Sequence, residues 1–209
     1  MAPTRTFGKR IKRNEDPRLL TGQALFVDDV DLPGMGHAAF VRSPYAHARI
    51  IDIDFAAALE KEGVIAVYTA ESIGDLWQQG PLLVQPPPIE NLVFNTRTQV
   101  PLAKDKVRYA GEPVAVVIAE SRYVAEDAVD EIWVDYEPLT AVVDLEQAIR
   151  EDAPLIHEDV EFVPGAGANV HAHAIQVKGE GPRFDAIAKE AAVVVKRRFY
   201  YDHGTAAAM

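Results

Sequence analysis

The feature that most constrains the fold is an unbroken apolar run, VAVVIA, at residues 114–119. Four of its six side chains are β-branched, and the run is shorter than a typical helix. A turn sequence, Gly111-Glu112-Pro113, stands directly before it and favours a sharp reversal of the chain. We therefore predict a buried strand over 114–119, with the glycine supplying the backbone freedom that the reversal needs.

A helix is predicted directly after this strand. Ser121 is suited to cap it, and five apolar residues recur at helical spacing: Val124, Ala125, Ala128, Val129 and Ile132. A second strand is predicted over 133–136. A buried strand, an amphipathic helix and another strand indicate a layer in which the helix packs on a sheet. The expected fold class is therefore α/β (α+β), a mixed sheet with packed helices.

Further elements of the same unit are expected before this core. The predicted strands cover 24–27, 37–42, 48–53 and 64–68, and a short helix covers 55–62. Residues 78–100 interrupt the pattern, because their prolines do not fit inside regular elements. A loop of this length usually has a role. It covers a subunit interface or shapes a funnel, or it is a surface insertion without a role; the sequence leaves both open.

A second unit begins after a connecting segment rich in proline and glycine. Within it the sequence predicts a strand over 172–177, a helix over 183–192 and a strand over 193–201. Tyr200 and Tyr201 are core or interface aromatics, and a place in the core is favoured. A unit of this size buries its apolar face poorly, so we expect it to be incomplete. The predicted division is an arm at 1–20, an α/β domain at 21–150, a linker at 151–168 and the incomplete unit at 169–209.

Composition limits the kinds of partner. The net charge of −11 argues against nucleic acid, and the absence of cysteine excludes disulfides and thiolate ligation of iron–sulfur clusters by this chain. The first twenty residues carry a net +4, against −15 for the remainder. They form a solvated arm or an arm docked on an acidic surface. No secretory signal or apolar segment of membrane-spanning length is evident, so a soluble cytoplasmic protein is expected.

The sequence contains no complete catalytic constellation. A phosphate-binding glycine-rich loop and an HExxH motif are both missing. His171 and His173 share one face of a predicted strand and so suit a metal, but a third ligand is not evident, and solvent-facing histidines are favoured. The carboxylates between Glu120 and Glu161 suit acid–base or calcium chemistry. Most of them lie on the polar side of the predicted helix and are expected in solvent.

Two blocks of the sequence resemble one known family. They are RNEDPRLLTGQALFVDDVDLPGMGHAAFVRSPYAHARI (13–50) and KVRYAGEPVAVVIAESRYVAEDAVDEIWVDYEPLTAVVD (106–144). Both are similar to the N-terminal part of the molybdenum-binding large subunit of the xanthine dehydrogenase, aldehyde oxidase and carbon monoxide dehydrogenase family, and they occur in the family's order. The resemblance implies an α/β hammerhead domain over 21–150, followed by the start of a molybdopterin-binding domain.

The resemblance also implies cofactors and partners. Members bind molybdopterin, as the cytosine dinucleotide or a close relative, and a glutamate deprotonates a metal-bound hydroxyl that attacks an electron-poor carbon. Electrons leave through iron–sulfur clusters and FAD on partner subunits. That glutamate and nearly all pterin contacts lie downstream of the matched region, so no catalytic residue and no metal ligand is assigned here. His203 is a weak candidate for cofactor binding, and a structural or exposed histidine is favoured.

Two functions of different classes stay open. In the first, the chain is the N-terminal segment of a molybdenum-dependent oxidoreductase that hydroxylates an aldehyde, an N-heterocycle or a similar small substrate, or oxidises carbon monoxide. The chain alone is then inactive and works with the remainder of the molybdenum subunit, an iron–sulfur subunit and an FAD subunit. In the second, it is a non-catalytic interaction or assembly module that kept the hammerhead fold. A small independent enzyme that uses the acidic cluster is disfavoured.

Overall fold

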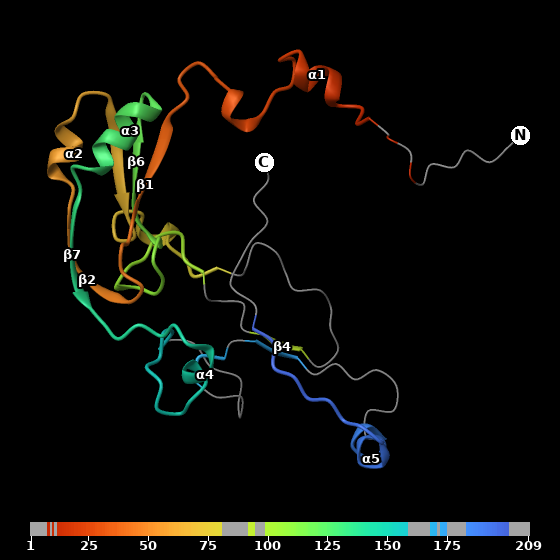
Figure 1. Ribbon diagram of the computed structural model, residues 1–209. Helices are drawn as coiled ribbons and strands as arrows, with labels where there is room; N and C mark the ends of the chain where they lie inside the picture. The colour runs from red at the N-terminus through yellow and green to blue at the C-terminus, as the bar shows by residue number, and fades with distance from the viewer. Residues whose placement is uncertain are drawn as a thin grey trace, which may run out of the picture. The chain divides into compact units, whose positions relative to one another are not determined.

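In the computed structural model the chain forms two compact units (Figure 1). The first unit comprises residues 1–78 and 100–141, and the second comprises 79–99 and 142–209. The residues that the structure describes are 8, 10, 12–80, 92–94, 99–158, 168–170, 172–174 and 183–200.

The apolar run at 114–119 forms the central strand of the first sheet. Strand β6 (Pro113–Ala119) lies between β1 (His37–Arg42) and β3 (Val64–Thr69), and both pairings are antiparallel. Val117 of β6 stands opposite Ala39 of β1 and Val67 of β3. Its position between two neighbours gives hydrogen-bond partners to both edges of β6, and Val114, Ala115, Val117 and Ala119 are buried, as the sequence predicts for a buried strand.

A second antiparallel sheet belongs to the same unit. Its order is β5 (Lys106–Val107), β2 (Ala48–Asp54) and β7 (Trp133–Pro138). The register of β2 against β7 shifts between Ile50 and Asp52, so a bulge interrupts this pair. The strands on either side of the predicted helix, β6 and β7, therefore lie in different sheets.

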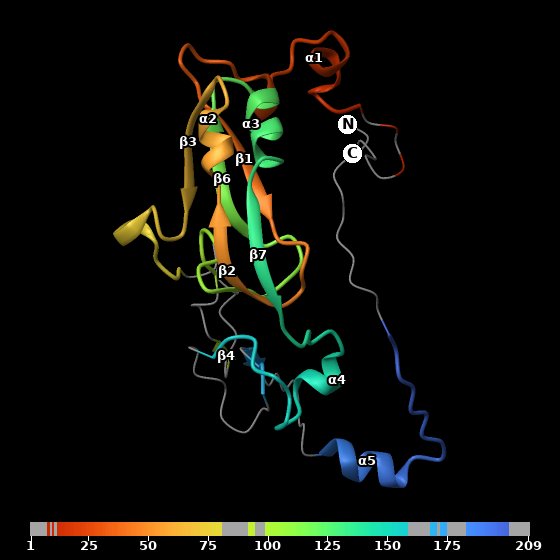
Figure 2. The ribbon, with the colours of Figure 1, turned by 90° about the vertical axis from the view of Figure 1, so that its left-hand side faces the viewer.

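Helices cover one face of the first sheet. Helix α3 (Arg122–Val129) contacts β1 and β6, and α2 (Ala56–Glu60) contacts β3. Figure 2 shows the two helices side by side over this sheet. The Ser121 hydroxyl accepts the backbone N–H of Val124 at 3.3 Å and so caps α3, as predicted. The segment before β1 adds α1 (Asp16–Leu20) and the 3-10 turn η1 (Val27–Asp29), and η2 (Gly74–Leu76) follows β3.

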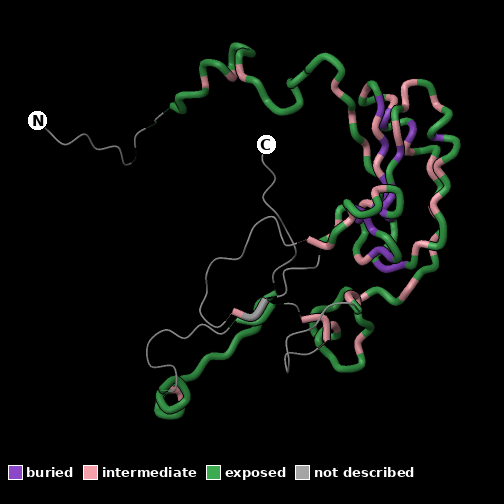
Figure 3. Tube along the Cα trace, turned by 180° about the vertical axis from the view of Figure 1, so that it is seen from behind, coloured by how far each residue is buried: buried purple, intermediate pink, exposed green. Residues whose placement is uncertain are grey.

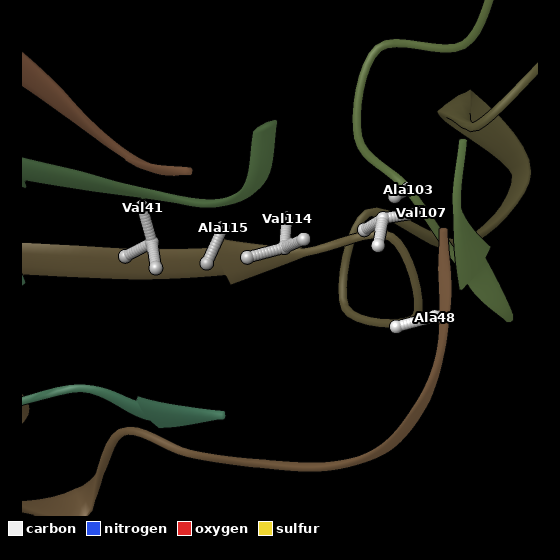
Figure 4. Close-up of a cluster of buried hydrophobic side chains, with 6 residues drawn as sticks. All are labelled: Val41, Ala48, Ala103, Val107, Val114 and Ala115. Atoms are coloured by element: carbon white, nitrogen blue, oxygen red, sulfur yellow. The ribbon is translucent and has the colours of Figure 1, made fainter. Parts of the chain in front are cut away.

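The core of the first unit consists of small and β-branched side chains. One cluster joins the two sheets and consists of Val41, Ala48, Ala103, Val107, Val114 and Ala115 (Figure 4). The other lies under the helices and consists of Ala58, Val67, Val117 and Ala128. Figure 3 shows that the buried residues gather in this unit, whereas the described residues of the second unit are exposed or intermediate. Small side chains let strands and helices approach closely, so the fold depends on tight packing rather than on large aromatic residues.

The second unit is sparse in the residues that the structure describes. Strand β4 (Leu92–Phe94) pairs antiparallel with β8 (Ala172–Ala174). Helix α4 (Leu145–Ala148) is capped by Asp144, which accepts two backbone N–H groups, and α5 (Phe184–Glu190) follows β8. Asn169 adopts a left-handed backbone, with φ of 57°, and its side chain bonds to Ala148, Pro154 and Ile156.

The expected α/β (α+β) class is confirmed, but the expected mixed sheet is not found: all strand ladders between the described residues are antiparallel, and they form separate sheets. Two predicted strands are wrong. In place of a strand over 24–27 the chain forms η1, because the Asp29 carboxylate accepts the Phe26 N–H at 2.9 Å and closes a turn. Residues 193–200 are exposed and form no strand, since no other described segment pairs with them.

Candidate functional site

Glu112 is the most enclosed carboxylate among the residues that the structure describes. Glu112 is only 4% exposed, and it occupies the turn that leads into β6. The carboxylate accepts the backbone N–H of Arg108 at 2.5 Å. Gly111 beside it has φ of 90°, a conformation that glycine adopts without the steric cost of a Cβ. The predicted reversal at Gly111 is therefore confirmed, and the buried Glu112 carboxylate stabilises it through the hydrogen bond to Arg108.

The end of β1 is fastened to the same turn. The Arg42 guanidinium donates to the Gly111 carbonyl at 2.8 Å. The Ser43 N–H donates to the Glu112 carbonyl at 2.9 Å, and the Gly111 N–H donates to the Ser43 carbonyl at 2.7 Å. These bonds join two segments far apart in the sequence and satisfy backbone groups that would otherwise be buried without partners.

Burial raises the pKa of Glu112, because the charged form is poorly solvated there. The backbone N–H and the positive charge of Arg108 act in the opposite direction and lower the pKa, as does the backbone N–H of Tyr109. Burial also raises the pKa of Tyr109, with the Glu112 charge adding to the increase and Arg42 opposing it. A carboxylate engaged by the backbone of its own turn is suited to fixing that turn, not to abstracting a proton from a substrate.

A second polar group is buried where β2 begins. His47 is 6% exposed, and its Nδ1 lies 2.8 Å from the Thr140 carbonyl. That contact requires the hydrogen on Nδ1, so the neutral ring presents Nε2 as an acceptor. Nε2 is buried and has no hydrogen-bond partner in the described part of the chain. The centroids of the Tyr45 and Tyr136 rings lie 5.2 Å apart, and burial raises the pKa of Tyr136.

The described residues do not bring the predicted site residues together in one site. His203, Tyr201 and His171 lie outside the described residues. His173 lies in β8, is exposed and stands opposite Val93. Tyr200 is 80% exposed and carries Arg198 over its ring, so its predicted place in a core is wrong. No described strand pairs with residues 193–200, and the ion pair of Arg198 with Glu146 of α4 leaves Tyr200 exposed.

The acidic residues of α3 and of the two positions after it lie where the helical pattern predicts. Glu126, Asp127, Asp130 and Glu131 are all exposed, and Glu126 pairs with Arg122 at 3.2 Å. Among the described residues, no group of three His, Asp or Glu side chains is arranged to hold a metal ion. The predicted solvated face is confirmed.

A shallow pocket of about 400 Å³ lies beside β2. Residues 50–53, 69–71 and 103–105 line most of it, and its carboxylates, Asp52, Glu71 and Asp105, are all exposed. Lys104 lies among them and stacks over the Trp77 ring at 5.6 Å. Exposed charges on three separate segments are typical of solvated surface. The described residues therefore present no set of metal ligands, and the carboxylates of this pocket are solvent-exposed.

Residues 21–140, more than half of the chain, match the family described as aldehyde oxidase and xanthine dehydrogenase, a/b hammerhead domain. The chain belongs to this family. Its hammerhead domain thus contains the Glu112 turn, the His47 contact and both sheets. The family resemblance of the two sequence blocks is confirmed.

Relatives of the hammerhead chain include subunits with assigned activities. It is 41% identical over 198 residues to the carbon monoxide dehydrogenase large chain of Afipia carboxidovorans, covering 93% of this chain and 23% of that one. It is 44% identical over 143 residues to the nicotine 6-hydroxylase large subunit of Paenarthrobacter nicotinovorans, covering 68% and 17%. The hammerhead chain therefore spans about a fifth of the length of these relatives.

Solved structures agree with this assignment. The crystal structure of a Cu,Mo-containing carbon monoxide dehydrogenase superposes with a TM-score of 0.71 at 38% identity, covering 89% of the hammerhead chain and 23% of the other. Quinoline 2-oxidoreductase from Pseudomonas putida 86 superposes with a TM-score of 0.58 at 45% identity, covering 66% and 17%. No helix within the described residues is long and apolar enough to cross a membrane.

Sequence reasoning missed Glu112 and His47. Charged and imidazole side chains are normally exposed, and nothing local in the sequence distinguishes His47. The available signal was the position of Glu112 between a turn glycine and a proline, directly before the most apolar strand.

Proposed function

We propose that this chain is the N-terminal part of the large subunit of a molybdenum hydroxylase and is inactive alone. The observation that carries the proposal is the match of 93% of the chain to 23% of a carbon monoxide dehydrogenase large chain. The described residues offer a scaffold with satisfied buried polar turns and no catalytic set. A scaffold of this kind fits a role in supporting reactive groups that the rest of the subunit supplies.

The reaction class follows from the relatives. One is a carbon monoxide dehydrogenase large chain, one a nicotine 6-hydroxylase large subunit, and one a nicotinate dehydrogenase large molybdopterin subunit. We therefore assign to the complete enzyme the oxidative hydroxylation of an aldehyde, an N-heterocycle or a similar small substrate, or the oxidation of carbon monoxide. Molybdopterin, as the cytosine dinucleotide, would supply the hydroxylating chemistry. The described residues do not fit its metal, since no ligand group is present among them.

The proposed partners are the remainder of the large subunit, an iron–sulfur subunit and an FAD subunit. This chain has no cysteine and so provides no thiolate for a cluster. One relative is the gamma subunit of a 6-hydroxypseudooxynicotine dehydrogenase complex, which supports an assembly of several chains. The proposed location is the cytoplasm. The proposed division keeps an arm at 1–20, the hammerhead domain at 21–150, a linker at 151–168 and the start of a cofactor domain at 169–209.

Reconstitution tests this proposal. The chain is co-produced with the remaining part of the Afipia carboxidovorans large chain, as a separate polypeptide, and with that enzyme's partner subunits. Dye reduction is then measured with carbon monoxide, an aldehyde and an N-heterocycle in turn. We expect turnover of at least one substrate by the assembled complex and none by the isolated chain. An isolated chain that turns over substrate would contradict the proposal, as would a chain that does not assemble.

A further inference from the structure

The sheet formed by β1, β6 and β3 has a face that neither helix of the first unit covers, and Gly36 lies close to Ile118 at the edge of this face. Helices α2 and α3 and the core clusters lie on the other side. The register places two apolar rows on the uncovered side: Phe40–Val116–Tyr68 and Ala38–Ile118–Ala66. We call these six residues the open sheet face. Because directly paired residues point to the same side of an antiparallel sheet, the rows form one continuous surface.

The composition of this face is unusual for a surface in contact with water. Phe40 is 44% exposed and Tyr68 is 42% exposed. An antiparallel sheet with one face in solvent normally alternates apolar and polar residues along each strand. In β6 both alternating sets are apolar, which is the pattern of a strand that is covered on both faces.

The second sheet shows what a solvated face looks like in the same unit. The exposed positions of β2 and β7 include Arg49, Asp54, Asp135 and Glu137, and Arg49 pairs with Glu137 at 3.7 Å. The absence of such charges from the open sheet face is therefore specific to that sheet. A cation borders the face, since the Arg42 guanidinium lies 5.6 Å from the Phe40 ring centroid. An apolar centre with a charged rim is typical of a protein–protein interface.

We infer that the open sheet face docks the remainder of the same large subunit. The length of chain outside this structure supports that occupant, because the relatives extend over about four times the matched length. A second copy is a poorer partner, since two chains of net charge −11 repel each other. The inference deepens the proposed function and depends on it. The occupant should present an apolar patch to Phe40 and Tyr68.

Binding to a defined probe tests this docking. The probe is the part of the Afipia carboxidovorans carbon monoxide dehydrogenase large chain that follows the segment similar to this chain. The variant Phe40→Thr/Tyr68→Thr keeps β-forming residues in both strands while it removes the aromatic surface. The matched control is Trp133→Thr, another aromatic on a strand, which is 75% exposed on the other sheet. Circular dichroism establishes that each variant is folded, and Kd is measured by calorimetry.

We expect the unaltered chain and the control to bind the probe, and the double variant to bind about tenfold or more weakly. If the double variant does not fold, Tyr68→Thr alone replaces it, with a smaller loss expected. Equal binding by all forms would overturn the inference while the proposed function stands. Failure of the unaltered chain to bind would overturn both. A dimer of the unaltered chain that the double variant abolishes would assign the face to a second copy and overturn the inference.

Discussion

The Glu112 carboxylate accepts the backbone N–H of Arg108 at 2.5 Å, inside a turn that delivers the chain into the central strand β6. The same turn is bonded to the end of β1 through Arg42 and Ser43. One buried acid therefore fixes the register at which two strands of the first sheet begin to pair. Several consequences of this arrangement can be measured on the isolated chain.

The first concerns the pH dependence of stability. A carboxyl whose pKa is raised by folding stabilises the folded chain while it is protonated. That contribution is present below its ordinary value of 4.5 and is lost as the pH rises through the raised pKa. Glu112→Gln keeps an oxygen acceptor for the Arg108 N–H and does not titrate. The free energy of unfolding of the variant, relative to the unaltered chain, should increase as the pH rises from about 4.5 through the raised pKa.

Urea denaturation at a series of pH values measures this difference. Glu131→Gln is the matched control, because Glu131 is exposed and its replacement should change stability little. A difference between the Glu112 variant and the unaltered chain that stays constant with pH would contradict the proposed electrostatic role of burial.

The second prediction concerns Gly111. Its φ of 90° is strained for any residue with a Cβ, and a Cβ built there meets no atom within 4 Å. Gly111→Ala should therefore destabilise the chain by about 1–2 kcal/mol through backbone strain alone. Gly80→Ala serves as control, since a Cβ there also meets no atom within 4 Å and its backbone is not in the left-handed region. Thermal unfolding of both variants gives the answer, and an equal loss at the two positions would count against strain.

The third prediction concerns the cap of α3. Ser121 accepts the Val124 N–H, so Ser121→Ala should lower the free energy of unfolding by about 1 kcal/mol. Ser121→Asp should retain most of the stability, because a carboxylate caps a helix N-terminus equally well. Chemical denaturation of the two variants side by side tests this. An alanine variant as stable as the aspartate variant would show that the cap contributes nothing.

The fourth prediction concerns the core between the sheet and the helices. Val117 is fully buried beside Ala58, Val67 and Ala128, so Val117→Ala leaves a cavity that small neighbours cannot fill. We expect a loss of about 1–3 kcal/mol. Val27→Ala is the control, because Val27 is 89% exposed and should change stability by less than about 0.5 kcal/mol. Similar losses of unfolding free energy for both variants would show that Val117 is not part of the core.

Local pattern was sufficient to predict the elements around β6. The apolar run, the Ser121 cap and the stripe on α3 are short-range features, and each determines a strand or a helix largely by itself. Pairing is long-range, and so the sequence did not show that β6 and β7 enter different sheets. It likewise missed β4, whose partner β8 follows far along the chain.

The failures near the ends have a related physical cause. Residues 193–200 have the composition of a strand, but a strand forms only where a neighbour accepts its backbone hydrogen bonds. No described segment does so, and Tyr200 stays exposed. For the site, the sequence correctly predicted the glycine reversal and the solvated acids of α3. It did not reveal the burial of Glu112 or His47, because burial depends on which distant segments pack against a residue in the folded chain.

Metal analysis tests the central claim most directly, namely that this chain is a scaffold whose reactive groups come from the rest of the large subunit. The chain is produced in cells that make molybdopterin and is purified alone and as the reconstituted complex. Molybdenum is then measured by mass spectrometry. The account predicts essentially no molybdenum in the isolated chain and about one atom per complex, as expected when the cofactor site lies mainly outside this chain. Stoichiometric molybdenum in the isolated chain would contradict it.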